Sequence, residues 1–144
     1  MLIVVTLFLG SCSRAINLYK NGLPQGRWNH KTSEQDFSIG RYSSGKAVGK
    51  WKTVVNGNLY RKSRNRGNIE KIRLYHPNGV LKSKGTAKTD TVLKMHNGAW
   101  VKEVHWYYTG KWLEYSPDGK LLRVETYEKG EWIDDPWSGK KPTE

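Results

Sequence analysis

Few side chains of this sequence stand at spacings that would support catalysis or metal binding. No two of the four histidines are closer than nine residues, and the single cysteine is Cys12. A structural zinc site needs several such ligands at short spacing. Asp134 and Asp135 are adjacent, and adjacent residues of an extended chain point in opposite directions. We therefore expect no metal, no cofactor and no enzymatic activity.

Positive charge is the clearest chemical signal in the chain. Residues 41–88 hold 13 Lys and Arg against one acid, Glu70, so this segment accounts for the whole net charge of +12. A concentrated basic surface attracts anionic lipid, nucleic acid or an acidic protein. Its densest part supplies the candidate anion contacts Arg61, Lys62, Arg64 and Arg66. The alternative is that these charges only keep a thin sheet soluble and protect its edges from pairing.

Aromatic side chains are the second set of candidate contacts. The chain has seven Trp and eight Tyr, and both residue types serve well as anchors for a binding partner. The candidate aromatic binding face consists of Trp51, Tyr60, Tyr75, Trp112 and Tyr115. The same rings are equally suited to form the core of a sheet that has little else to bury. For the Trp residues that follow a Gly-x pattern, we favour the core.

The first twelve residues carry a third chemical signal. Residues 1–9 are uncharged and apolar, which is too short for a membrane-spanning helix of about 20 residues. They are followed by Gly10, Ser11 and Cys12, and this ending resembles the lipobox of bacterial lipoproteins. The resemblance implies a signal peptide over residues 1–11 that is removed, lipid on Cys12, and a lipid-anchored linker over residues 12–17. Ser13 after the cysteine implies the outer membrane, with the domain facing the periplasm.

The elements that position these residues follow from a repeat. Tyr19 and Gly22 recur 23 residues later as Tyr42 and Gly45, and Trp28 recurs as Trp51 at the same offset. Residues 75–81 match residues 115–121 at an offset of 40. Between the units lie Asn-Gly and Asp-Gly pairs, which supply the positive φ angles of tight hairpin turns. Since a single hairpin is marginal in water, neighbouring hairpins must join into one sheet.

This pattern resembles the MORN-variant repeat family, in which a Gly-x-Trp strand, an Asn/Asp-Gly turn and a Tyr-x-x-Gly turn alternate. The best match runs from Gly110 to Gly130. The resemblance implies an all-β fold over residues 18–132, an antiparallel single-layer sheet of successive β-hairpins used for contact rather than chemistry. A polar tail, residues 133–144, would follow. Bacterial members of the family are often described as antitoxin-like.

Three functions remain open at this point. The first is a lipid-anchored, non-enzymatic module of the bacterial cell envelope that binds a protein partner through its sheet. The second is an envelope protein that holds anionic lipid or glycolipid with residues 41–88. The third is an antitoxin-like or immunity-like protein, which rests on the family resemblance alone. We do not expect nucleic acid as a partner, because a domain outside the cytoplasm rarely meets it.

Overall fold

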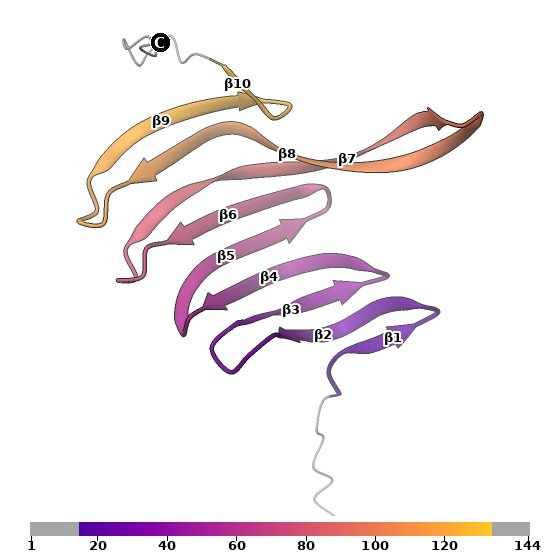
Figure 1. The fold of residues 1–144 in the computed structure, drawn as a ribbon, viewed down its shortest axis with the longest axis horizontal. Helices are drawn as coiled ribbons and strands as arrows, with labels where there is room; N and C mark the ends of the chain where they lie inside the picture. Colours follow the sequence, from indigo (N-terminus) through magenta and orange to yellow (C-terminus); the bar gives the residue numbers. More distant parts are fainter. Residues whose placement is uncertain (1–14, 134–144) are drawn as a thin grey trace, which may run out of the picture.

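The computed structural model describes residues 15–133, which form one antiparallel sheet of ten strands (Figure 1). Every strand pairs with the next one along the chain, so the order in the sheet is the order in the sequence. The predicted all-β, single-layer sheet of successive hairpins is therefore confirmed. Residues 15–133 include no helix of sufficient length and apolarity to cross a membrane. Cys12, the segment 1–11 and the tail from residue 134 lie outside the described residues.

The strands differ in length, and the two longest are neighbours. The outermost strands have three residues each, β1 (Leu18–Lys20) and β10 (Glu131–Ile133). Seven to ten residues make up β2 (Leu23–Lys31), β3 (Phe37–Ser43), β4 (Lys46–Val55), β5 (Asn58–Arg66), β6 (Ile69–Tyr75) and β9 (Leu121–Glu128). The longest are β7 (Leu81–His96) and β8 (Ala99–Tyr115), with 16 and 17 residues.

The hairpin turns lie where the Asn-Gly and Asp-Gly pairs predict them. Asn56 and Gly57 have φ angles of +50° and +73°, which is the left-handed pair of a two-residue hairpin turn. Gly79 and Gly119 have φ angles of +83° and +86° in the two Pro-containing turns. Each of these two glycines donates its backbone N–H to a carbonyl three residues earlier, at 2.9 Å. The turn predictions at all three positions are confirmed.

Two tryptophans of the Gly-x-Trp units, Trp51 and Trp112, lie flat across a glycine of the preceding strand. The ring of Trp51 covers Gly40, and the ring of Trp112 covers Gly85 so closely that a Cβ there would lie 2.1 Å from a ring carbon. Trp28 and Trp112 are buried, at 8% and 6% exposure. The expectation that these tryptophans form core is confirmed for both. It is wrong for Trp132, which is 51% exposed, because β10 is the last strand and no described strand lies beyond it.

One face of the sheet carries two aromatic clusters in place of a second layer. The N-terminal cluster joins β2, β3 and β4, with ring centroids 5.1 to 6.0 Å apart, and contains Trp28, His30, Tyr42 and Trp51. The C-terminal cluster joins β8 and β9, with centroids 4.0 to 5.4 Å apart, and contains Trp106, Tyr108, Trp112 and Tyr127. Edge-to-face ring pairs of this kind add to the stabilisation from burial. We call this side of the sheet the aromatic face.

The hairpin of β7 and β8 extends beyond the rest of the sheet. The backbone pairing of β6 with β7 ends at Lys88, and the pairing of β8 with β9 begins at Gly110. In Figure 1 the two strands project together past the turns of the neighbouring hairpins and cross each other as they twist. We call residues 90–106 the arm.

Candidate binding surfaces

The register of the strands sorts the charged side chains onto the face opposite the aromatic clusters. Side chains alternate along a strand, and directly opposed residues of antiparallel strands share a face. One continuous row across β4 to β7 consists of Lys52, Lys62, Arg73 and Lys84. A second row, two residues along the strands, contains Lys50, Arg64 and Lys71. All seven therefore lie on one side of the sheet, which we call the basic face.

The basic face extends across most of the sheet. In full it contains Arg27, Arg41, Lys50, Lys52, Lys62, Arg64, Lys71, Arg73, Lys84 and Lys111, which together line a shallow concavity of about 1120 Å³. No Asp or Glu of the described residues lines this concavity. All of these cations are exposed except Lys84, which is half-buried. None of them forms an ion pair within residues 15–133.

This arrangement costs stability in the isolated domain. Directly opposed residues have Cβ atoms about 4.5–5.5 Å apart, and like charges in such pairs are destabilising, where an opposite-charge pair would contribute roughly 0.2–1 kcal/mol. The row on β4 to β7 contains three such pairs in succession. These strands are central, so protection of a sheet edge does not explain their charge. An anionic ligand would relieve the repulsion.

Two tyrosines belong to the basic face. The ammonium of Lys62 lies 5.5 Å from the centre of the Tyr75 ring, and that of Lys84 lies 5.6 Å from the centre of the Tyr115 ring. Cation–π contacts at such distances hold the lysine stems down on the rings. The positive charges are thereby positioned without being neutralised.

The structure separates the residues that the sequence grouped as anion contacts. Lys62 and Arg64 lie on the basic face, and alternation places Arg66 at the end of β5 on the same side. Arg61 points to the aromatic face, where its guanidinium lies 2.7 Å from the carboxylate of Glu70. Three of the four residues are thus brought together, and Arg61 is held elsewhere in an ion pair.

The five aromatic candidates do not form one face either. Trp51 and Trp112 lie in the two clusters of the aromatic face. Tyr75 and Tyr115 contact lysines of the basic face. Tyr60 is exposed at a register shift between β4 and β5. The candidates are therefore distributed over both sides of the sheet.

Sequence reasoning overlooked the spacing that builds the basic face. The cations of β4, β5 and β6 stand two residues apart, as Lys50 with Lys52, Lys62 with Arg64, and Lys71 with Arg73. A spacing of two on a strand places both side chains on one face. Arg27 and Lys111, which lie outside residues 41–88, join the same face. Each occupies the middle position of a Gly-x-Trp unit, directly before a tryptophan that points to the opposite side.

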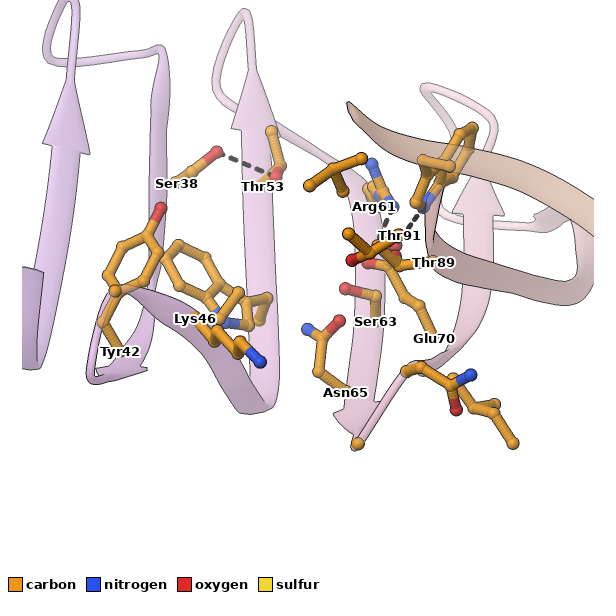
Figure 2. Close-up of a pocket in the computed structure, with 18 residues that line it drawn as sticks. Ser38, Tyr42, Lys46, Thr53, Arg61, Ser63, Asn65, Glu70, Thr89 and Thr91 are labelled. Carbon is orange, nitrogen blue, oxygen red and sulfur yellow. Dashed lines mark hydrogen bonds and ion pairs between the residues drawn. The ribbon is translucent and has the colours of Figure 1, made fainter. Parts of the chain in front are cut away.

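A groove crosses the aromatic face between the two clusters. It has a volume of about 870 Å³, and aromatic side chains stand at its two ends: Tyr42 and Trp51 at one, Trp106 at the other. Figure 2 shows Ser63 and Asn65 between Tyr42 on one side and Thr89 and Thr91 on the other. Small polar side chains thus lie in the middle of the groove, and the apolar side chains of Ala47, Ile69 and Val104 line it as well.

Two of the three charged side chains that line the groove, Arg61 and Glu70, neutralise each other. Arg61 donates to Oε1 of Glu70 at 2.7 Å, and the indole N–H of Trp106 donates to Oε2 of Glu70 at 3.1 Å. Lys46 stands exposed at the rim. Two residues of the lining also have a buried donor, Nε1 of Trp51 and Nε of Arg61, that finds no acceptor within the described part of the chain. A buried donor without an acceptor costs about 1–3 kcal/mol.

The arm carries apolar side chains on one side and a charged cluster on the other. The most exposed apolar residues on the first side are Leu93, Met95, Trp100 and Val104, each more than half exposed, whereas Val101, at 43% exposure, lies on the charged side. Glu103 on the opposite side accepts hydrogen bonds from Lys94 at 2.8 Å, His96 at 2.6 Å and His105 at 3.0 Å. These contacts, that of Lys94 above all, lower the pKa of Glu103 from 4.5 to about 2. Glu103 is therefore ionised throughout the physiological pH range.

Within residues 15–133, no group of three or more His, Cys, Asp or Glu side chains could hold a metal ion.

Comparison with known proteins adds no assignment to this geometry. The chain matches no protein-family model, no curated protein and no solved structure.

Proposed function

We propose that this protein is a non-enzymatic, lipid-anchored binding module of the bacterial cell envelope. Its basic face would hold the phosphate-bearing headgroups of anionic lipids or glycolipids. The observation that carries the proposal is the set of ten exposed or half-buried cations that line one concavity on one side of the sheet, with no Asp or Glu of residues 15–133 in that lining. Anionic membrane surfaces attract such charges with about 1 kcal/mol per Lys or Arg near the surface.

The position of Cys12 in the chain supports this orientation. Ile16 lines the concavity of the basic face, and Cys12 precedes it by four residues. Four extended residues span at most about 14 Å. A lipid on Cys12 would therefore keep the N-terminal end of the basic face within about 14 Å of the headgroups. By the lipobox resemblance this membrane is the outer membrane, with the domain in the periplasm.

Vesicle binding tests the proposal directly. The domain from Ser13 onward, which lacks the lipid, is sedimented with phosphatidylcholine vesicles that contain or lack one third phosphatidylglycerol. We expect binding to the anionic vesicles only, and loss of binding at about 0.5 M salt, because salt shortens the range of exposed charges from about 10 Å at 0.1 M to about 3 Å at 1 M. Equal binding to both vesicle types would contradict the proposal.

A matched pair of variants separates the basic face from net charge. One variant replaces Lys52, Lys62, Arg73 and Lys84 by Gln, and the control replaces Lys20, Lys102, Lys120 and Lys129. Both lose four positive charges. At about 1 kcal/mol per charge, the variant of the basic face should bind anionic vesicles about tenfold to a thousandfold more weakly than the unchanged domain. If the control weakens binding as much, the basic face has no special part in it.

A protein partner is the second candidate, and the arm favours it. Leu93, Met95, Trp100 and Val104 leave an apolar stripe exposed on a projecting hairpin. Exposed apolar patches of this kind mark interaction sites on soluble domains. Chemical cross-linking of the full chain in its membrane should then yield one adduct that disappears in Trp100→Ser with Val104→Ser. An adduct that survives both changes would place the partner elsewhere.

A further inference from the structure

The groove on the aromatic face exists because the repeat changes at its centre. Trp51 on β4 lies opposite Ser63 on β5, which in turn lies opposite Ile72 on β6. The units on either side place a tryptophan on the aromatic face, whereas β5 and β6 place Ser63 and Ile72 there. Trp51 leans over Gly40 and Trp112 leans over Gly85, so both rings lean toward the preceding strand. Ile72 is buried against Trp112 of the C-terminal cluster, so the groove opens on the side of Ser63, which lines it.

The chemistry of this groove differs from that of the basic face. Hydroxyl and amide groups line it, from Ser38, Thr53, Ser63, Asn65, Thr89 and Thr91. These side chains both donate and accept hydrogen bonds. The Arg61–Glu70 pair adds two charges that cancel, and the exposed Lys46 is the third charged side chain of the lining. A ligand that fits such an interior is uncharged and rich in hydroxyl groups.

The ends of the groove add a second requirement. Tyr42 and Trp51 present aromatic rings at one end, and Trp106, which is 48% exposed, presents one at the other. Aromatic rings offer flat apolar faces with a negative quadrupole, on which polarised C–H groups pack. Sugar rings combine C–H faces with hydroxyl edges. Amide and hydroxyl side chains beside exposed aromatic rings thus match both surfaces of a sugar.

We propose that this groove binds a neutral oligosaccharide chain. The sugar C–H faces would pack on Trp51 and Trp106, and the hydroxyl groups would bond to the polar side chains between them. The volume of about 870 Å³ lies within the range of about 300–1,000 Å³ that is common for small-molecule sites. This site lies on the opposite side of the sheet from the basic face and does not depend on the function proposed above.

The test uses uncharged tetrasaccharides as probes. The domain from Ser13 onward is titrated with cellotetraose, maltotetraose and N-acetylchitotetraose, while the indole N–H signals are followed by nuclear magnetic resonance. At least one probe should shift the Trp51 and Trp106 signals with a dissociation constant of about 1 mM or lower. The binding should be unchanged at about 0.5 M salt, because the probes carry no charge.

Matched variants locate the site. Trp106→Ala should weaken binding about tenfold, and Asn65→Ala should weaken it about threefold, as expected for loss of one aromatic and one hydrogen-bond contact. Trp100→Ala is the control, because Trp100 is a second exposed tryptophan of the arm, lies near its tip and does not line the groove. Thermal melts of all three variants establish that they are folded.

Several results would overturn the proposal. It is wrong if none of the three tetrasaccharides shifts the indole signals at about 10 mM, which is well above the expected dissociation constant. It is equally wrong if Trp100→Ala reduces binding as much as Trp106→Ala. An uncharged Ser-Gly octapeptide that binds where the sugars do not would identify the groove as a peptide site instead.

Discussion

At the scale of single residues, Gly85 illustrates how a single-layer sheet packs. The ring of Trp112 occupies the space in which any other residue would carry its Cβ, at 2.1 Å. We expect Gly85→Ala to destabilise the domain by about 2–3 kcal/mol, because overpacking forces the ring out of its position. Denaturant unfolding followed by tryptophan fluorescence measures this change.

A double-mutant cycle provides the control for Gly85. In the background of Trp112→Leu, which removes the flat ring, Gly85→Ala should cost less than about 1 kcal/mol. An equal cost in both backgrounds would mean that the glycine is needed for its backbone and not for the close approach of the ring.

Glu103 offers a test of electrostatics at one residue. Its pKa is lowered to about 2, first by the hydrogen bond from Lys94 and then by His105 and His96. Because the pKa in the folded state is below the ordinary value, the carboxylate stabilises the arm above pH 4.5. This contribution is lost as the pH falls towards 2. We expect Lys94→Gln to raise the pKa of Glu103, as measured by a carbon-13 titration of its carboxyl group. Lys102→Gln, a charge loss on the same arm without contact to Glu103, should leave it unchanged.

At the scale of the element, the β8–β9 hairpin depends on its turn. Gly119 has a φ angle of +86° and donates its backbone N–H to Ser116. A β-branched residue is a true outlier in this conformation. We therefore expect Gly119→Val to destabilise the domain by about 2 kcal/mol or more, a large share of a small domain's stability. Lys120→Val, one position on, should be nearly neutral, because its side chain is exposed and pairs only with Asp118. If the melting temperatures of the Gly119→Val and Lys120→Val variants agree within about a degree, this turn does not have the proposed role.

At the scale of the whole molecule, stability and binding should oppose each other. Lys62 lies directly between Lys52 and Arg73, so Lys62→Glu converts two repulsive pairs into attractive ones. At roughly 0.2–1 kcal/mol for each pair, the free energy of unfolding should increase by about 1 kcal/mol. The same change should weaken binding to anionic vesicles. Natural binding sites often have such a stability cost.

Lys20→Glu is the matched control for this trade-off. It changes the net charge equally, but Lys20 lies on β1, away from the row of opposed cations. Its effect on unfolding and on vesicle binding should be small. If Lys62→Glu leaves both properties unchanged, the row of opposed cations carries neither the repulsion nor the binding.

The local features of this fold were predictable from the sequence because they are properties of short segments. Positive φ at Gly57, Gly79 and Gly119 follows from the residue type and its neighbours. Alternating strands joined by tight turns favour pairing with the next strand along the chain. Local signals and chain order therefore predicted the open sheet of hairpins. Cys12 and its predicted lipid rest on the sequence alone.

The composition of the two faces was decided only by the tertiary structure. Register shifts at β3–β4, β4–β5, β6–β7 and β7–β8 change the phase of alternation, and a change of one residue moves every later side chain to the other face. Because of this alternation, Arg61 forms an ion pair with Glu70 on the aromatic face. The next residue, Lys62, lies on the basic face. It also joins Arg27 and Lys111, 84 residues apart, in one surface. Charge counts along the chain locate positive residues, whereas strand pairing across the sheet decides which of them act together.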